Sequence, residues 1–223
     1  MPLNFWKSKP NDEQFERERE IMVQAQLARR GITDDAVLRA FRRVPRHLFV
    51  EGQKPSYAYG DHPIPIHCGQ TVSQPYVVAY MLQKLRLQPS DSALEIGAGS
   101  GYQTALLAEI VQSVSSMEYH IPLVEPALRI LAELGYCNID IHAGDGSKGW
   151  PDANVRFDAI VGSAAASTVP ERLVEQLAPG GRMILPVGEH DQNLVLIQRS
   201  EDGSSLSESE LLAVRFVPLL TGS

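Results

Sequence analysis

The sequence is poor in cysteine and tryptophan, and it contains no long hydrophobic run. Its 223 residues include 2 Cys and 2 Trp. Cys68 and Cys137 lie far apart and form no CxxC pair, so the sequence indicates neither a disulfide framework nor a zinc site. No stretch reaches the roughly 18 apolar residues that span a bilayer, and residues 1–20 lack the apolar segment of a signal peptide. We therefore expect a cytoplasmic protein.

Positive charge is also in short supply. The chain has 20 Lys and Arg against 27 Asp and Glu, which gives a formal net charge of −7. Proteins that bind nucleic acids or anionic membranes through phosphate groups need clustered Lys and Arg. We therefore expect neither kind of partner. With 43% hydrophobic residues, the chain can fill the core of one soluble domain.

The beginning of the chain predicts two helices. After a frayed lead-in over residues 1–10, a charged helix is expected from about residue 11 to Gly31, which can cap its C-terminus. A second helix follows, and Thr33 or Asp34 can cap its N-terminus. It should end at Pro45, because proline clashes with the preceding helical turn.

A long stretch rich in Pro, Gly, Tyr and His follows, over residues 45–75. It has little periodicity and too many breakers for a long helix or strand, and a loop of this length is usually functional. We therefore expect a functional loop here, and residues 1–75 should form a cover that belongs to the same domain. Residues 76–223 should form its core.

The rest of the chain alternates between apolar strands and helices. Seven strands are expected, at residues 93–96, 114–118, 139–142, 157–162, 183–187, 194–198 and 212–217. Helices are expected at residues 76–85, 102–111, 122–134 and 170–177, with only a short turn near residues 147–150. The linker SEDGSSLSESE is too short for a crossover helix, so the last two strands should form an antiparallel hairpin. The pattern predicts a doubly wound, mostly parallel α/β sheet of seven strands.

The clearest motif, LEIGAGSGYQTA, begins at Leu94 and joins a strand to a helix through Gly97, Gly99 and Gly101. Glycine is needed where the chain turns sharply and where a ligand touches the backbone. The spacing differs from the G-x-G-x-x-G of dinucleotide-binding proteins, and no P-loop lysine follows. The motif therefore predicts a nucleoside-type cofactor. A glycine-rich turn without a ligand is the alternative.

Two acidic residues follow at the same edge of the predicted sheet. Glu118 ends the next strand, 21 positions after Gly97, where a doubly wound fold presents a carboxylate to ribose hydroxyls. Asp145 and Gly146 end the third strand, where a carboxylate beside an exposed N–H suits an adenine ring. The alternatives are an exposed glutamate at a strand end and a common Asp-Gly turn.

Six segments occur in a characteristic order: AYGDHPIPIHCGQTVSQP, LEIGAGSGYQTA, GDG, FDAIVGSAAASTVP, QLAPGGRMILPVG and VRFVPL. In order and spacing they resemble the protein-L-isoaspartate (D-aspartate) O-methyltransferase family, over about residues 22–220. The glycine-rich motif is shared by many S-adenosylmethionine-dependent methyltransferases, whereas the segments GQTVSQP and GGRMILPVG are far narrower signals that point to this family. The resemblance implies a Rossmann-like methyltransferase that uses S-adenosyl-L-methionine. Its acceptor would be the free carboxyl group of L-isoaspartyl or D-aspartyl residues in damaged proteins, whose methylation initiates repair.

This chemistry is compatible with the residues present. A carboxylate is ionised at neutral pH and the leaving group is a neutral thioether, so no general base, metal or covalent nucleophile is required. The sequence contains no evident hydrolytic triad or metal-ligand motif. The partners implied are isoaspartyl peptides and proteins, and a monomer is favoured.

The resemblance also implies that the loop over residues 45–75 covers the substrate, and it implies roles for individual residues. Ser73 would orient the acceptor oxygen as the catalytic residue, or cap a helix, or both. Asp61 would help to shape the acceptor pocket or cap a turn. The cofactor-binding residues are Gln70, Thr71, Glu95, Gly97, Ala98, Gly99, Gly101, Glu118, Asp145 and Gly146. The substrate-binding residues are Ile66, Ser73, Pro186, Val187 and Gly188, the last three through backbone pairing with an extended peptide unless they simply end a strand.

The chain departs from the family pattern at several positions. His67, followed by Cys68, stands where the family has Gly; a protonated imidazole there could attract a carboxylate or narrow the pocket, or it could simply face solvent. Tyr119 replaces a basic residue, and Ser163 and Ser167 replace Thr and Pro. Two alternatives therefore stay open: a methyltransferase that acts on another acceptor, and a non-catalytic module that binds S-adenosylmethionine.

Overall fold

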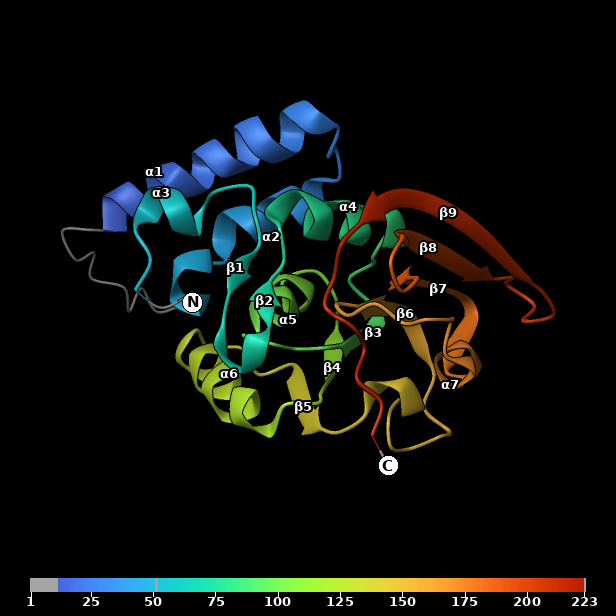
Figure 1. Cartoon of the computed structure of the whole chain (residues 1–223). Helices are drawn as coiled ribbons and strands as arrows, with labels where there is room; N and C mark the ends of the chain where they lie inside the picture. Colours follow the sequence, from blue (N-terminus) through green and yellow to red (C-terminus); the bar gives the residue numbers. More distant parts are fainter. Residues whose placement is uncertain (1–11, 51, 223) are drawn as a thin grey trace.

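Seven strands of the computed structural model form one sheet, in the order β5-β4-β3-β6-β7-β8-β9 (Figure 1). The structure describes residues 12–50 and 52–222, so the lead-in expected over residues 1–10 lies outside these ranges. The strands are β3 (Ser92–Ile96), β4 (Ser113–Glu118), β5 (Ile139–Ala143), β6 (Phe157–Gly162), β7 (Leu177–Val187), β8 (Gln192–Arg199) and β9 (Leu206–Val214). β5, β4, β3, β6 and β7 are parallel, and β8 and β9 follow as an antiparallel hairpin. The predicted fold class is confirmed.

The central strand β3 is buried on both of its faces, as is typical of a parallel strand between two helical layers. Leu94 and Ile96 pack into one hydrophobic cluster, whereas Ala93 packs into the other. Ile96 is aligned with Met117 of β4 and with Gly162 of β6. The carboxyl ends of these three strands therefore lie side by side at one edge of the sheet.

Helices cover the two faces of the sheet unequally. The larger hydrophobic cluster joins the N-terminal helices to α4 (Pro75–Leu85), α5 (Tyr102–Ala108) and α6 (Ile121–Glu133) (Figure 1). The smaller cluster lies under the short helix α7 (Glu171–Glu175), near the turn η5 (Gly146–Lys148). The four predicted helices are confirmed with small shifts at their ends, and the third crossover is the predicted short turn.

One continuous helical segment begins the described chain and changes its geometry along its length. It runs through α1 (Asp12–Ile21), the π-helix η1 (Met22–Leu27) and the 3-10 turn η2 (Ala28–Arg30), and it ends at Gly31 with φ of 94°. The predicted C-cap is confirmed, but a regular helix up to Gly31 is wrong. Met22 and Leu27, five positions apart, are both fully buried, and the wider π-turn brings such a pair onto one face.

Helix α2 (Asp35–Arg43) confirms the second predicted N-cap. The Asp34 carboxylate accepts hydrogen bonds from the backbone N–H groups of Ala36 at 2.9 Å and Val37 at 3.1 Å. These bonds satisfy two of the donors that a helix start leaves without partners.

The loop expected over residues 45–75 contains short elements and no long one. β1 and β2 form a small antiparallel hairpin in which Ile64 pairs with Val72. This hairpin holds the segment of residues 66–73, which we call the cover loop. The elements are η3 (Arg46–Phe49), α3 (Pro55–Ala58), β1 (Ile64–Pro65), η4 (His67–Gly69) and β2 (Thr71–Val72).

The strands at the hairpin edge are longer than predicted. β9 begins at Leu206 instead of residue 212 and ends at Val214 instead of residue 217. All five residues of its first half, LSESE, are exposed, so it shows none of the apolar alternation from which strands are predicted. Pairing with β8 forms this part of the strand, for example between Leu196 and Ser209.

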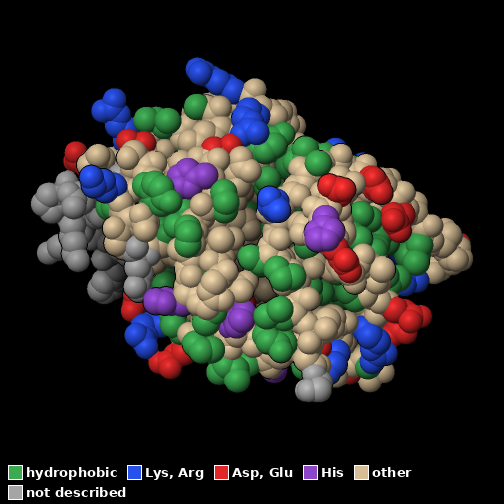
Figure 2. Space-filling view, viewed as in Figure 1, with side chains coloured by type: hydrophobic (Ala, Val, Ile, Leu, Met, Phe, Trp, Pro, Cys, Tyr) green, Lys and Arg blue, Asp and Glu red, His purple; other side chains and the backbone are tan. Residues whose placement is uncertain are grey.

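The described surface carries no concentrated basic patch on the face seen in Figure 2. Lys and Arg side chains are scattered over that face, and Asp and Glu side chains gather on the right, over the region of β8 and β9. Within residues 12–50 and 52–222, no helix is long and apolar enough to span a membrane.

Candidate active site

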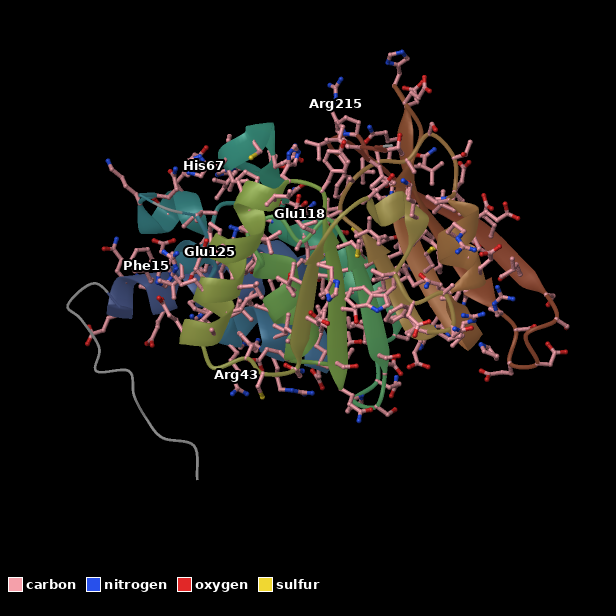
Figure 3. The ribbon with its side chains drawn as sticks, turned by 90° about the horizontal axis from the view of Figure 1, so that it is seen from below. Phe15, Arg43, His67, Glu118, Glu125 and Arg215 are labelled. Carbon is pink, nitrogen blue, oxygen red and sulfur yellow. The ribbon has the colours of Figure 1, made fainter. Side chains whose placement is uncertain are left out.

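A cavity lies at the carboxyl ends of β3, β4 and β6, where three segments far apart in sequence meet. The turn after β3 and the end of β4 form its floor, and the cover loop lies on one side. Figure 3 shows Glu118 at the strand ends, between the segment that carries His67 and the segment that carries Arg215. The lining includes Gln70, Thr71, Val72, Ser73, Ile96, Gly97, Ala98, Gly99, Ser100, Tyr102, Gln103, Glu118, Tyr119, His120, Gly146, Ser163, Ala164, Val217, Pro218, Leu219 and Leu220.

The glycine-rich turn has the geometry that its sequence predicts. Gly97, Gly99 and Gly101 have φ of 92°, 57° and 87°, a region that side chains with a Cβ rarely occupy. The Gly97 N–H donates to the Met117 carbonyl at 2.8 Å, which holds the turn against β4. A Cβ on Gly101 would lie 3.1 Å from Leu131 Cδ1, so glycine is also required for packing against α6.

Glu118 is held by backbone donors on both sides of its carboxylate. Oε2 accepts from the Gly99 N–H at 2.8 Å, and Oε1 accepts from the His120 N–H at 2.7 Å. Only 4% of the residue is exposed, yet it lines the cavity. Each carboxylate oxygen has a second lone pair, so Glu118 can accept further hydrogen bonds from a ligand.

Glu95 lies beneath the glycine-rich turn and does not line the cavity. Its carboxylate accepts hydrogen bonds from Gln103 Nε2 at 3.1 Å and Thr104 Oγ1 at 2.6 Å, and from the Ser116 hydroxyl. Complete burial raises the pKa of Glu95 to about 7 against the lowering effect of these three donors. The residue therefore connects β3, β4 and α5 instead of facing a ligand.

Asp145 and Gly146 are placed differently with respect to the cavity. Gly146 lines it, whereas Asp145 lies beside it with both oxygens engaged. One oxygen accepts from the Ser147 N–H at 2.9 Å, and the other from the Gly222 N–H at 3.1 Å. Although burial opposes the shift, these hydrogen bonds hold the pKa of Asp145 below its usual value.

The cover loop is fastened to the sheet side of the cavity by a side-chain contact. Gln70 Nε2 lies 3.1 Å from His120 Nε2 and also donates to the Cys68 carbonyl at 3.2 Å. Because Nε2 of Gln70 is a donor, His120 Nε2 acts as the acceptor in this arrangement. Gln70, Thr71 and Ser73 all line the cavity, so the structure brings the three predicted cover residues together.

Asp61, and not Ser73, satisfies the N-terminus of α4. That helix begins at Pro75 after Gln74, and no side chain of the cap residue itself bonds to it. Asp61 instead accepts from the Tyr76 N–H at 3.1 Å and from Gln74 Nε2 at 2.7 Å, and it pairs with Arg30. The capping alternative for Ser73 is therefore wrong. Asp61 therefore caps the start of α4 and not the turn in its own loop.

The predicted substrate residues are less well grouped. Ile66 lines a neighbouring apolar pocket with Phe49, Pro122 and Ile130, across Gly99 from the main cavity.

The backbone of Pro186–Gly188 is already paired. The Pro186 carbonyl accepts from the Ala166 N–H at 3.0 Å, and the Gly188 N–H donates to the Ala166 carbonyl at 2.9 Å. The opposite edge of β7 pairs with β8 up to Val187. A peptide would need unpaired N–H and C=O groups to add as a strand. The predicted pairing of substrate with residues 186–188 is therefore contradicted in this structure.

Sequence reasoning missed the wall formed by Val217–Leu220. The Ala165 N–H donates to the Val217 carbonyl at 2.8 Å, and the Leu219 N–H donates to the Ala165 carbonyl at 2.7 Å. These bonds bring the segment after β9 back to the end of β6, where it lines the cavity. The segment VRFVPL is one of the six that carry the family resemblance, so a signal was present, but it has no local pattern that indicates a ligand.

The three principal departures from the family pattern have different surroundings. Ser163 lines the cavity and its hydroxyl accepts from Gln103 Nε2 at 2.8 Å. Tyr119 also lines the cavity, with 42% of the residue exposed. His67 lines the apolar pocket beside Ile66, and not the main cavity. The two departures closest to a ligand are therefore Ser163 and Tyr119.

Comparisons with known proteins point to one family. Residues 17–223 match the model of the family described as protein-L-isoaspartate(D-aspartate) O-methyltransferase (PCMT). The chain is 51% identical to a protein-L-isoaspartate O-methyltransferase from Petrotoga mobilis over 207 residues, which cover 92% of this chain and 97% of the relative. It is 49% identical to protein-L-isoaspartate O-methyltransferase 2 from Pelobacter propionicus, with 92% and 91% covered.

A solved structure has the same fold along almost its whole length. It is the crystal structure of a beta-aspartate methyltransferase (PCMT) from Plasmodium falciparum in complex with S-adenosyl-L-homocysteine. The TM-score is 0.79 at 29% sequence identity, and the alignment covers 92% of this chain and 98% of the other.

Proposed function

Because the chain belongs to the protein-L-isoaspartate (D-aspartate) O-methyltransferase family, we propose that it methylates the free carboxyl group of L-isoaspartyl and D-aspartyl residues in damaged proteins. The methyl donor is S-adenosyl-L-methionine, and the ester formed initiates repair. The alignment covers nearly the whole of this chain and of its relatives, so the proposal concerns the complete family domain.

The sheet side of the cavity fits the nucleoside part of this cofactor. Glu118 lies at a strand end with lone pairs facing the cavity, where it binds the ribose hydroxyls. Gly97, Ala98 and Gly99 line the cavity, where a ligand can contact the backbone, and Gly146 lines it at the end of β5. Glu95 acts indirectly, because it fixes the turn from below through Thr104, Ser116 and Gln103.

The cover side provides the acceptor site. Among the described residues, the Ser73 hydroxyl has no hydrogen-bond partner, and the residue lines the cavity opposite the glycine-rich turn. It donates a hydrogen bond to one oxygen of the acceptor carboxylate and so aims the other oxygen. Gln70 and Thr71 close the cavity beside it, which excludes water that would compete with the acceptor.

When bound, S-adenosylmethionine supplies an electrophilic methyl group and a neutral thioether leaving group. An acceptor carboxylate oxygen forms the new O–C bond as the S–C bond breaks, and no proton is transferred. The protein therefore contributes orientation and exclusion of water, for which intramolecular reactions allow effective molarities of about 10⁵ M or more.

The observation that carries this proposal is the meeting of Ser73 and Glu118 across one cavity. Either residue by itself fits several functions. Together, Glu118 on the sheet side, where a cofactor can bind, and the Ser73 hydroxyl on the cover side, where an acceptor can bind, fit methyl transfer between the two. The reacting methyl group and carboxylate should therefore meet between the sheet side and the cover side of the cavity.

Incubation with methyl-labelled S-adenosylmethionine and a matched pair of isoaspartyl and aspartyl peptides tests the proposal. We expect base-labile label on the isoaspartyl peptide alone. Label on neither peptide, with the cofactor bound, would favour another acceptor or a non-catalytic module, and Ser163 and Tyr119 would then be the first residues to revert to the family pattern.

A further inference from the structure

Arg46 is a fully buried cation directly behind the cover side of the cavity. It begins the turn η3 and has 0% exposed surface. Nε donates to the Ala58 carbonyl at 2.9 Å, and Nη2 donates to the Ser73 carbonyl at 3.0 Å. The guanidinium carbon lies 4.8 Å from the centre of the Tyr102 ring. Arg46 therefore touches two residues of the cavity wall, Ser73 and Tyr102.

No acidic side chain forms an ion pair with Arg46 within residues 12–50 and 52–222. Asp61 is the acidic group that interacts with it electrostatically, but the Asp61 oxygens bind Arg30, Gln74 and the Tyr76 N–H. Burial lowers the pKa of Arg46, yet a guanidinium stays protonated at neutral pH. A buried charge without a counterion costs free energy that an incoming anion can recover.

Arg46 Nη1 and the Tyr102 hydroxyl are both buried, and within the part of the chain that the structure describes they interact with each other and hydrogen-bond to no third group. The hydroxyl is neutral, so this contact supplies no negative charge to the guanidinium. Tyr102 lines the cavity, and thus the positive potential of Arg46 reaches the cavity through a wall only one residue thick.

We propose that Arg46 is the fixed countercharge for a carboxylate bound at the Ser73 and Tyr102 end of the cavity. This inference rests on the proposed function, which brings two carboxylates to the site: the acceptor carboxyl of the substrate and the methionine carboxyl of the cofactor. The shared chemistry is an anion in a water-poor site, where electrostatic attraction is stronger than in water. Arg46 is a positioning residue, because it also fixes the Ser73 carbonyl.

The sign of the effect distinguishes binding from chemistry. Methyl transfer to a carboxylate by a sulfonium group destroys one negative and one positive charge, so the transition state is less anionic at oxygen than the bound substrate. A cation behind the carboxylate stabilises the bound substrate at least as much as the transition state. Loss of the Arg46 charge should therefore raise KM for the peptide and leave kcat within a few-fold.

The experiment measures the coupling between the charge of Arg46 and the charge of each ligand. Wild type, Arg46→Met and Arg46→Lys are titrated with an isoaspartyl peptide and with the same peptide in which that carboxyl is a carboxamide. They are also titrated with S-adenosylhomocysteine and its decarboxylated form. Arg182→Met is the matched control, because Arg182 is a partly buried arginine that already has an acidic partner, Asp91.

We expect the preference for the charged peptide to fall about tenfold in Arg46→Met and to be largely retained in Arg46→Lys and Arg182→Met. A fall in the charged-cofactor preference instead assigns the carboxylate to the cofactor and also supports the proposal. Unchanged ratios for both ligand pairs would overturn it, because a merely structural loss weakens charged and neutral ligands equally.

A measurement on the wild type keeps the test valid if Arg46→Met does not fold. An isoaspartyl peptide with a ¹³C-labelled carboxyl is titrated by NMR, free and bound together with S-adenosylhomocysteine. We expect a lower pKa for the bound carboxyl; an unchanged or raised pKa, together with equal affinities of the wild type for S-adenosylhomocysteine and its decarboxylated form, overturns the proposal. Failure of the proposed function is separate, since it would show as absence of labelling by the unaltered protein.

Discussion

Glu118 and Ser73 face the same cavity from opposite sides, and different kinds of contact hold them. On the sheet side, Glu118 is fixed by the backbone N–H groups of Gly99 and His120, both of which belong to the turns that follow β3 and β4. On the cover side, the Ser73 carbonyl is held by the buried side chain of Arg46, and the chain just after it is held by Asp61.

This difference between backbone and side-chain contacts indicates which parts of the site depend on the fold itself. Backbone contacts on the sheet side persist as long as the strands and turns form. Side-chain contacts on the cover side can be removed one by one without loss of the sheet. We therefore expect substitutions on the sheet side to alter cofactor binding and stability, and substitutions on the cover side to alter turnover of the acceptor.

Glu95 gives the largest expected effect, which is on the pH dependence of stability. Its buried carboxylate holds the sheet side of the site together. A folded-state pKa of about 7, above the usual 4.5, favours the protonated form. Its contribution to stability is therefore fully present below about pH 4.5 and is lost as the pH rises through 7. The free energy of unfolding of the wild type should fall by about 3 kcal/mol relative to Glu95→Gln over this range. Urea denaturation at several pH values measures it, and parallel pH profiles would show that Glu95 titrates normally.

Ser73→Ala tests the cover side directly. We expect methyl transfer to fall roughly 100-fold, the size seen when one positioned hydrogen-bond donor is removed from an active site. The Kd of S-adenosylhomocysteine and the Tm should stay close to the wild-type values. Initial rates and calorimetry measure both quantities, and Ser207→Ala on the exposed strand β9 is the matched control. If Ser73→Ala lowered turnover and cofactor affinity equally, the cover side would not act on the acceptor separately from the cofactor.

Glu118→Ala is the corresponding test of the sheet side. Loss of charged hydrogen bonds worth about 1.5 to 3 kcal/mol should weaken cofactor binding about 10- to 100-fold. Calorimetry measures the affinity, and Glu125→Ala on the exposed face of α6 is the control. Unchanged affinity would exclude Glu118 from the site.

Asp61→Ala should have a smaller effect and one confined to the cover side. It removes the acceptor of the Tyr76 N–H at the start of α4 and the partner of Gln74. We expect a loss of about 1 kcal/mol in stability, typical of a lost helix cap, and a several-fold lower turnover of peptide with unchanged cofactor affinity. A change in cofactor affinity as large as the change in turnover would show that the two sides are not separable.

Arg43→Ala gives the smallest expected effect. Arg43 on α2 pairs with Glu109 beside α5 at 3.2 Å, and its side chain is 76% exposed. Exposed ion pairs usually contribute less than about 1 kcal/mol. Thermal unfolding and peptide turnover should both stay near wild type. A marked loss of activity would mean that surface charges also position the cover.

The same contrast explains what the sequence could predict. The sheet, its helices and the glycine-rich turn follow from local apolar periodicity and from glycine spacing, and the structure agrees. The exposed first half of β9 shows no such periodicity, because only pairing with β8 makes it a strand. The bonds of the cover side join residues that are 27 positions apart for Arg46 and Ser73, and 50 apart for Gln70 and His120. No local pattern marks contacts of that range.

The segment Val217–Leu220 has a consequence for the order in which the protein becomes active. During synthesis, the glycine-rich turn and the cover loop leave the ribosome well before this segment, which completes the cavity wall through its bonds to Ala165. A nascent chain can thus assemble most of the parallel sheet while its cavity is still open on one side. The cavity wall is complete only after elongation has passed residue 220.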